Sequence, residues 1–180
     1  YLKKKKVPFI KLREPGGSKN SEKIRKLILD KKSNFNNNTD LLLYLASRSE
    51  NIEKIINKFY KKKLILIDRF TDSTIAYQHF GMGVDKKIIK IINNYLLRKL
   101  KVNFTFLHIV NEKNLKLRLL KRKNLNRYDN FKYSFYKKVQ KGFIKESNLN
   151  KKKYLIIDSN KKINENKKKI LNKINKLIKI

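Results

Sequence analysis

An acid, an arginine and a group of hydroxyls follow directly on a short apolar run in the middle of the chain. The run is Leu64–Ile67, and Asp68, Arg69, Ser73 and Thr74 come after it. In open parallel sheets, ligands bind beyond the carboxyl ends of the strands. An arginine fork suits a phosphate group, and a carboxylate can accept hydrogen bonds from the water shell of Mg²⁺. The segment therefore predicts a site for a phosphate and its metal at the end of a buried strand.

A second pair of residues has the spacing of a base-binding site. Tyr44 and Arg48 are four residues apart, so on a helix they share one face. A flat ring there could stack on a base while the guanidinium donates to the edge of that base, which suits a pyrimidine carbonyl. The alternative is that Tyr44 belongs to the core and Arg48 is a solvated surface charge.

Strand-like and helix-like segments alternate along the chain and are expected to position these residues. Residues rich in β-branched and aromatic types predict strands at 7–12, 64–67, 104–110 and 154–158. Capping residues and helical spacing predict a helix from Asn20 or Ser21, a long one from Thr39 or Asp40 to about residue 60, and others at 86–100, from 112, at 131–147 and at 161–180. This alternation indicates an α/β fold with crossover connections and a largely parallel sheet covered on both faces.

The composition narrows the class of protein. A chain of 180 residues with 40% apolar residues is long enough for one domain, and we expect a single one. No cysteine is present, which fits a reducing cytoplasm, and two separate histidines do not favour a zinc site. No apolar run approaches the roughly 20 residues that cross a bilayer, so no membrane association is expected.

The strongly basic balance has two readings. The net charge is +34, from 48 Lys and Arg against 14 Asp and Glu. Such an excess can mark a surface for nucleic acid, but it then gathers on one face or in one segment. Here lysine is spread through nearly every segment together with asparagine and isoleucine, so compositional drift explains it without a nucleic-acid partner.

Three motifs in the same order and spacing resemble those of bacterial thymidylate kinases. They are Arg13–Gly17, Leu42–Arg48 and Asp68–Gln78, and a basic segment and terminal helix like those of the family follow them. The resemblance implies a three-layer P-loop nucleoside monophosphate kinase fold with a parallel sheet. It also implies transfer of the γ-phosphoryl group of ATP, with Mg²⁺, to dTMP to give dTDP for dTTP synthesis.

The resemblance assigns roles to five residues of the acceptor site. Tyr44, where the family more often has Phe, would stack on thymine, and Arg48 would hydrogen-bond the base. Arg69 would clamp the acceptor phosphate, and Asp68 would contact Mg²⁺ through water. Tyr77 would pack against the deoxyribose and crowd a 2′-hydroxyl; the plain alternatives are an aromatic core residue for Tyr77 and a carboxylate paired only with arginines for Asp68.

Further residues match positions that surround the acceptor nucleotide in the family. They are Glu14 and Pro15 in the turn after the first strand, Arg25 in the next helix, and Ser73, Thr74 and Gln78. Arg25 lies beside the apolar stripe of its helix and would contact a phosphate, although an exposed helix arginine needs no ligand. Ser73, Thr74 and Gln78 would offer donors and acceptors to the thymine ring and the phosphate.

A basic segment at about residues 118–130 resembles the short lid of the family. Lid arginines neutralise charge on the transferring phosphoryl group, and electrostatic positioning carries most of this chemistry. Arg122 and Arg127 are the candidates, because Arg127-Tyr128-Asp129 is similar to a family Arg-x-Glu motif. Asn126 stands where the family usually has an acid.

The phosphate-cradling sequence Gly-x-x-x-x-Gly-Lys-[Ser/Thr] occurs nowhere in the 180 residues. In the family this loop lies on the first strand and helix, so we expect that about 20 to 25 residues are missing before Tyr1 and that the chain is inactive alone. Family members are usually homodimers, and a homodimer is expected here. Two other functions stay open: a kinase for another pyrimidine nucleotide, and a basic nucleic-acid-binding protein on a degenerate kinase scaffold.

Overall fold

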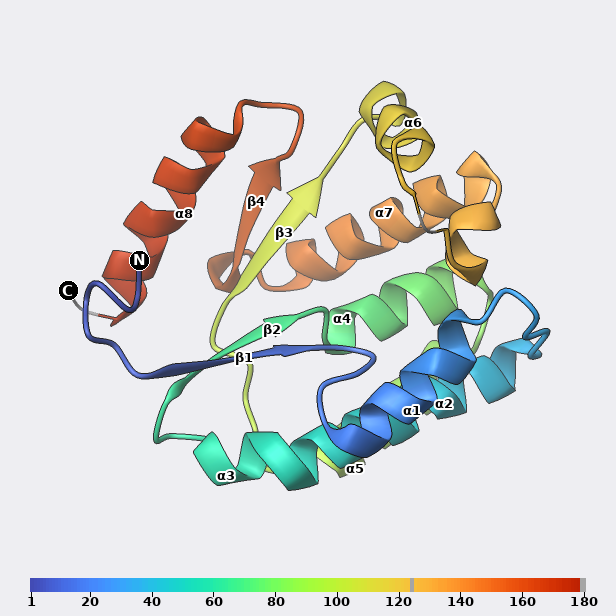
Figure 1. Cartoon of the computed structure of the whole chain (residues 1–180), viewed down its shortest axis with the longest axis horizontal. Coiled ribbons are helices and arrows are strands. Elements are labelled where there is room, and N and C mark those ends of the chain that lie inside the picture. The colour runs from blue at the N-terminus through green and yellow to red at the C-terminus, as the bar shows by residue number, and fades with distance from the viewer. Residues whose placement is uncertain (124, 179–180) are drawn as a thin grey trace. The chain divides into compact units, whose positions relative to one another are not determined.

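The computed structural model describes residues 1–123 and 125–178, which fold into alternating helices and strands (Figure 1). They group into two compact units, Tyr1–Lys101 with Leu125–Phe143 and Val102–Asn124 with Ile144–Ile180. Each unit is described by itself, and the single domain expected from the sequence stays a prediction. None of the helices in the described part of the chain is long and apolar enough to span a membrane.

The first unit contains one parallel strand pair and most of the helices. Its elements are β1 (Phe9–Arg13), α1 (Lys19–Leu29), α2 (Asn37–Asn51), the π-helical η1 (Ile52–Ile56), α3 (Asn57–Phe59), β2 (Leu64–Asp68), α4 (Thr71–Thr74), the π-helical η2 (Ile75–Gly81), α5 (Lys86–Leu97), the 3-10 turn η3 (Arg127–Asn130) and the start of α7 (Tyr133–Leu149). Strand β1 pairs with β2 in register from Phe9 opposite Leu64 to Arg13 opposite Asp68. The two strands therefore end side by side.

The second unit contains another parallel strand pair. Its elements are β3 (Thr105–Ile109), α6 (Glu112–Leu120), the end of α7, the 3-10 turn η4 (Lys151–Lys153), β4 (Tyr154–Asp158) and α8 (Ile163–Ile178). The register runs from Thr105 opposite Tyr154 to Ile109 opposite Asp158. Both pairs are parallel, as the alternation of elements predicts, and all four predicted strands are confirmed to within two residues.

The first residues of two helices differ from those predicted from the sequence. Helix α1 begins after Ser18, whose side chain accepts from the Ser21 backbone N–H, rather than after Asn20 or Ser21. Helix α2 begins after Asn36, whose side chain accepts from Thr39 N–H. The prediction of Thr39 or Asp40 as its cap was wrong, because the earlier asparagine already satisfies the free N–H groups. The carboxylate of Asp40 is consequently free for other partners.

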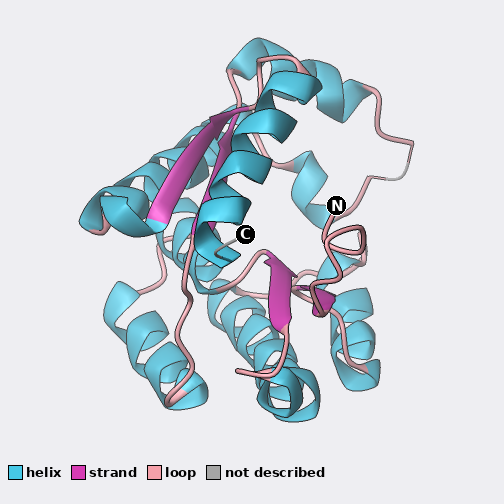
Figure 2. Cartoon of the chain, turned by 90° about the vertical axis from the view of Figure 1, so that its left-hand side faces the viewer, coloured by secondary structure: helices cyan, strands magenta, loops and turns pink. Residues whose placement is uncertain are grey.

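Three apolar clusters join the elements of the first unit; Figure 2 shows all helices of the chain in cyan and its strands in magenta. Leu41 and Leu45 of α2 pack with Ile75, Val84 and Ile89. The other two clusters join β1 to η1 (Leu12, Ile52, Ile56) and η2 to α7 (Ala76, Phe135, Val139). The clusters fix α2 against the segment of residues 71–81, and the candidate site lies between these two.

A glycine sets the approach of η2 to α7. A Cβ added at Gly81 would lie 2.6 Å from the Phe135 ring, closer than real contacts allow. Because Gly81 carries no side chain, the ring of Phe135 can pack on the end of η2. This contact positions the start of α7, which follows the 3-10 turn η3 in the chain.

Candidate active site

The carboxyl ends of β1 and β2 bring the first site residues together. Glu14 follows β1, and its backbone N–H donates to the Asp68 carbonyl at 2.9 Å. Asp68 and Arg69 are exposed there, while Glu14 and Pro15 are buried. Arg69 has a φ of 64°, a left-handed conformation that is uncommon for a residue with a side chain. Such backbone strain gathers at functional sites, and here it turns the chain sharply at the end of β2.

Two arginines form a positive cluster at this edge. Arg25 of α1 donates to the Pro15 carbonyl at 2.7 Å. Burial lowers the pKa of Arg25, and the charges of Arg13 and Arg69 lower it further, whereas Glu22 and Tyr44 oppose the shift. Arg25 and Arg69 are therefore close enough to repel each other. A phosphate dianion would relieve that repulsion.

The guanidinium of Arg69 is held over an aromatic ring. Its central carbon lies 5.0 Å from the centroid of the Tyr77 ring, within the range of a cation–π contact. Partial burial works against the charged form, but Tyr77, Tyr44 and Asp68 together raise the pKa of Arg69 above its ordinary value. The guanidinium of Arg69 is thus charged, oriented by the Tyr77 ring and still accessible.

One face of α2 makes two polar contacts with the segment of residues 71–81. Arg48 donates to the Thr74 hydroxyl at 2.9 Å, and Asp40 accepts from the Gln78 side-chain amide at 3.1 Å. Asp40, Tyr44 and Arg48 follow one another at four-residue spacing, so Tyr44 lies between the two contacts on the same face of the helix. The structure thereby brings together Tyr44, Arg48, Thr74 and Gln78, and their roles towards a nucleotide stay predictions.

Arg48 is enclosed rather than solvated. Its side chain is 1% exposed and donates to Glu14 Oε2 at 2.8 Å, to Asn93 Oδ1 at 2.6 Å and to Thr74. Its guanidinium also lies 5.1 Å from the Phe70 ring centroid. The alternative of a solvated surface charge was therefore wrong. The base-reading role of Arg48 stays a prediction, and the geometry favours a role in holding the loop at Glu14 onto α2.

Glu14 keeps one buried oxygen for another partner. Its side chain is 4% exposed, and burial raises the pKa of Glu14 while the ion pair with Arg48 opposes the shift. Within the part of the chain that the structure describes, Glu14 Oε1 has no hydrogen-bond partner. A buried acceptor without a donor costs about 1–3 kcal/mol, so such an atom points to a bound ligand or water.

Tyr44 belongs to an aromatic cluster that the sequence reading only partly anticipated. Its ring meets the Tyr128 ring edge to face at 6.1 Å between centroids, and Tyr128 meets Tyr77 at 6.0 Å. Burial raises the pKa of Tyr44 to about 12 and, together with Tyr44 and Asp40, raises that of Tyr128 as well. In the sequence, Tyr128 is only the middle residue of the Arg127-Tyr128-Asp129 lid motif. Its place against the expected base-stacking ring makes it a further site residue.

Asp40 is the residue that sequence reasoning missed. It is 1% exposed and accepts from the Tyr128 hydroxyl at 2.5 Å, from Gln78 Nε2 and from the Arg127 guanidinium. The signal that could have found it is its place one turn before Tyr44 and two turns before Arg48 on the same helix face. A residue that only caps the helix would not have to share a face with Tyr44 and Arg48.

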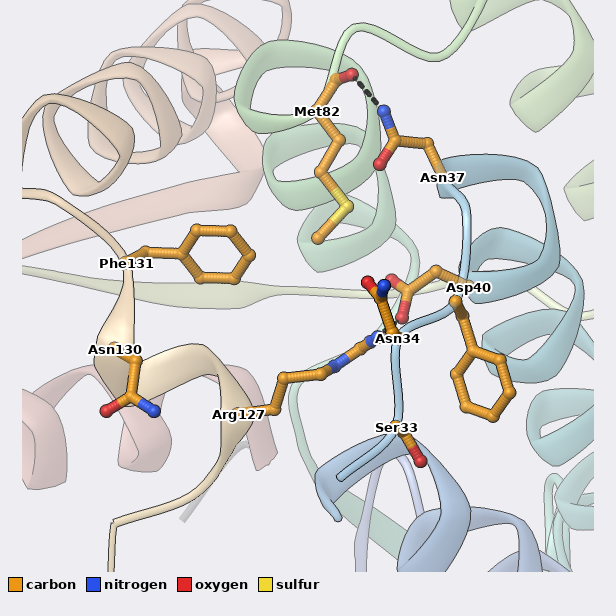
Figure 3. A pocket seen from close by; sticks show the side chains of 9 residues that line it. Ser33, Asn34, Asn37, Asp40, Met82, Arg127, Asn130 and Phe131 are labelled. Carbon is orange, nitrogen blue, oxygen red and sulfur yellow. Dashed lines mark hydrogen bonds and ion pairs between the residues drawn. The ribbon is translucent and has the colours of Figure 1, made fainter. Parts of the chain in front are cut away.

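A cavity of about 390 Å³ lies beside the Asp40–Arg127 ion pair (Figure 3). Figure 3 shows Arg127 reaching from η3 towards Asp40, with Asn130 and Phe131 on the same side and Asn34 close by. The Nε atom of Arg127 is buried and has no partner within the described residues. Arg127, expected to be a lid arginine, is thus engaged with Asp40 in this conformation.

Two further predicted residues, Ser73 and Arg122, belong to different units of the chain. Ser73 lies half-buried in α4, and its backbone N–H donates to the Phe70 carbonyl at 3.0 Å. Arg122 is exposed and belongs to the second unit, whereas Arg127 belongs to the first. The catalytic roles of both lid arginines therefore stay predictions.

The described residues contain no group of three or more His, Cys, Asp or Glu that could hold a metal by themselves. Mg²⁺ in phosphoryl-transfer sites needs only one or two carboxylates, because substrate phosphates and water supply its other oxygens. The exposed carboxylate of Asp68, next to the cluster of Arg25 and Arg69, fits that modest requirement.

Comparisons with known proteins agree with the motifs. The family model of thymidylate kinase matches residues 1–170. Thymidylate kinase of Thermosipho africanus is 35% identical over 164 residues, which cover 91% of this chain and 81% of that protein. The enzyme of Sulfurihydrogenibium sp. is 38% identical over 168 residues, covering 92% and 81%. The crystal structure of thymidylate kinase from Ehrlichia chaffeensis superposes with a TM-score of 0.73 at 26% identity, covering 93% of this chain and 81% of that one.

Proposed function

Because this chain belongs to the thymidylate kinase family, we propose that it binds dTMP at the carboxyl ends of β1 and β2 and directs its phosphate towards the γ-phosphoryl group of ATP. Phosphorylation of dTMP gives dTDP, the precursor of dTTP. The observation that carries the proposal is that Arg25 is bonded to the Pro15 carbonyl just after β1, that Arg69 at the end of β2 lies 5.0 Å from the Tyr77 ring, and that Tyr44 affects the pKa of both arginines. This arrangement supports a site with two guanidinium groups for a phosphate and an aromatic ring for a base.

Each side chain has a part in positioning the acceptor. Arg69 and Arg25 bind the 5′-phosphate, and Tyr77 bounds the sugar. Tyr44 offers its ring to the pyrimidine, and the buried Oε1 of Gln78, which has no partner within the described chain, accepts from the N3–H of thymine. Phosphoryl transfer depends mainly on such positioning and on neutralising the phosphate oxygens.

Mg²⁺ and ATP are the expected cofactor and donor. Asp68 would hold the metal through water, and a bound Mg²⁺ neutralises charge on the phosphate oxygens. Arg127 and Arg122 would add positive charge near the transferring group when the lid segment closes. In the present conformation Arg127 is retained by Asp40, so closure requires that ion pair to rearrange.

The 180-residue chain contains no Gly-x-x-x-x-Gly-Lys-[Ser/Thr] sequence, and we propose that it binds dTMP without turning it over. Calorimetry on the 180-residue chain should show dTMP binding that is tighter than binding of UMP or CMP. A coupled assay with ATP and Mg²⁺ should show no dTDP. Formation of dTDP by this polypeptide would contradict the second statement, and a preference for CMP or UMP would contradict the first.

The nucleic-acid reading is tested with the same protein. If the lysine excess is compositional, a short DNA duplex should bind weakly, lose affinity steeply with salt, and leave the dTMP affinity unchanged. Tight DNA binding near physiological salt that dTMP does not affect would favour the basic scaffold instead.

Exposed apolar side chains on α5 support the homodimer. Ile88, Ile91 and Tyr95 are 49%, 66% and 70% exposed, and Leu42 of the adjoining α2 is 58% exposed. Isolated exposed apolar residues are ordinary, but these fall on two helices that pack together through the core. Light scattering after gel filtration should give twice the chain mass, and Ile91→Lys should halve it. Leu120→Lys, at an 82% exposed position of α6, is the matched control and should leave the dimer intact.

A further inference from the structure

Asp40 connects three parts of the first unit through one carboxylate. It lies in the first turn of α2 and accepts from Gln78 in η2 and from Arg127 and Tyr128 in η3. The residues of η3 lie 87 and 88 positions away in the chain. Since Asp40 is 1% exposed, these donors replace its hydration almost completely.

The contact with Asp40 determines which way the Gln78 amide points. A carboxylate only accepts hydrogen bonds, so the NH₂ group of the amide must face Asp40. The carbonyl oxygen must then face the other way, and this is the buried Oε1 that has no partner within the described residues. An amide without such a neighbour could rotate and present either group.

We propose that Asp40 is a positioning residue for base selection: it fixes the side chain of Gln78 so that an acceptor, and not a donor, meets the pyrimidine. The inference rests on the proposed function, because it takes Gln78 as a contact of the base. Thymine carries a donor at N3–H, whereas the N3 atom of cytosine is an acceptor. An oriented Oε1 therefore favours dTMP over dCMP, and an amide free to rotate serves both.

The proposal also explains why one carboxylate serves both η2 and η3. Arg127 donates to Oδ1 of Asp40, whereas the Tyr128 hydroxyl donates to Oδ2, the oxygen that also accepts from Gln78, and Tyr128 at the same time packs on Tyr44. The orientation of the amide and the cover of the expected stacking ring thus depend on the same group. Loss of the carboxylate should affect both, but only the amide orientation should change the choice of base.

The test is a calorimetric measurement of the dissociation constants of dTMP and dCMP for five forms of the 180-residue chain. They are the unchanged chain, Asp40→Asn, Gln78→Ala, the double variant, and Leu41→Val. Asp40→Asn keeps the shape of the side chain but allows the amide of Gln78 to rotate. Leu41→Val removes one methylene from the core beside Asp40 and serves as the control for general destabilisation.

We expect Asp40→Asn to reduce the preference for dTMP over dCMP about tenfold, the usual effect of one hydrogen bond, and Leu41→Val to leave it unchanged. Gln78→Ala should reduce the preference by a similar factor, and Asp40→Asn should have no further effect in that background. An Asp40→Asn chain with the original preference, or an effect that persists fully without Gln78, would overturn the inference. An unchanged preference in Gln78→Ala would instead contradict the proposed contact with the base.

A second measurement covers the case in which Asp40→Asn does not fold. The side-chain NH₂ of Gln78 can be identified in a nitrogen-correlated NMR spectrum as the pair of signals that Gln78→Ala removes. Bonded to a buried carboxylate, these protons should exchange with solvent at least about tenfold more slowly than those of free glutamine. Exchange at the rate of free glutamine would show that Asp40 does not hold the amide, and would overturn the inference.

Discussion

Two aspartates, one in each unit, organise their surroundings in opposite ways. Asp40 is buried and receives a guanidinium, a phenol and an amide from distant parts of the chain. Asp158, at the end of β4, is reached by water and accepts from the backbone and side chain of Asn160, at 2.9 and 2.6 Å. Hydrogen bonds to Asn160 lower the pKa of Asp158, whereas burial governs the shifts around Asp40.

The comparison shows what burial adds to a polar network. Around Asp158 the partners are neighbours in sequence or surface groups, such as Arg118, which donates to the Ser159 carbonyl at 2.7 Å. Water can replace any of these contacts, so each contributes little to stability. In the first unit, removal of one buried partner leaves the other charged and unsolvated. Polar substitutions should therefore cost far more around α2 than around β4.

The largest effect is expected at the buried ion pair. Arg48→Ala leaves the carboxylate of Glu14 unpaired at 4% exposure, and should lower the free energy of unfolding by about 3–5 kcal/mol. Urea denaturation followed by circular dichroism measures it. The double variant Glu14→Gln/Arg48→Met removes both charges and should recover part of the loss. A loss below about 1 kcal/mol for Arg48→Ala would mean that buried polar contacts around α2 contribute no more to stability than exposed ones around β4.

Arg69 lies in the first unit but is exposed, and so should affect binding rather than stability. Arg69→Ala should weaken dTMP binding about 10- to 100-fold, the worth of a charge-assisted contact, and leave thymidine binding nearly unchanged. Calorimetry with both ligands tests this. Arg98 also has a positive φ and is exposed, so Arg98→Ala is the matched control and should bind dTMP normally. Equal losses for dTMP and thymidine would exclude a phosphate contact.

Tyr44 makes the buried region sensitive to alkaline pH. Its pKa is raised to about 12 in the folded chain, above about 10 for an unfolded tyrosine. The stability it contributes is therefore complete below pH 10 and is lost as pH rises towards 12, by about 3 kcal/mol at most. Urea unfolding at several pH values should show this extra loss in the unchanged chain but not in Tyr44→Phe. A parallel pH dependence of the two would contradict the burial of the phenol.

The smallest effect is expected at Asp158. Asp158→Asn should lower the melting temperature by no more than about 2–4 °C at neutral pH. Since the pKa of Asp158 is lowered in the folded chain, its contribution is present above about pH 4 and is lost as the pH falls through the folded value. Thermal melts at pH 7 and pH 3 should show the difference between the two chains shrinking. A larger loss at Asp158 than at Arg48 would reverse the comparison.

The order and type of elements were largely predictable because they depend on local patterns. Apolar runs at 64–67 and 154–158 and helical spacing at 86–97 are visible without tertiary contacts. The helical segment 71–81 was not assigned, because its hydroxyl-rich start has a low helix propensity and tertiary packing of Ile75 and Ala76 decides its structure. The start of α2 lies in the run Asn36–Asn38, where several residues could cap equally well.

The candidate site was predictable to the extent that motifs mark it. Residues that are spaced along one element, such as Tyr44 and Arg48, can be identified from sequence, because their four-residue spacing puts them on one face of α2. The burial of Arg48 and the role of Asp40 cannot be identified in this way, because they depend on Asn93 and on Arg127 and Tyr128, which are far away in sequence. Such contacts depend on how whole helices and strands pack together, and a short stretch of sequence does not contain that information.

The π-helical form of η2 carries a consequence for insertions and deletions. In residues 75–81 each backbone hydrogen bond joins residues five apart in the chain, whereas in an α-helix it joins residues four apart. This π-helical segment directly follows the α-helical turn Thr71–Thr74. Deleting a residue here would let the segment return to α-helical spacing, and inserting one would widen it further, so either changes the angle between Thr74 and Gln78 around the axis. The contacts of Thr74 with Arg48 and of Gln78 with Asp40 depend on that angle. The segment should therefore tolerate exchange of its outward side chains far better than the gain or loss of one residue.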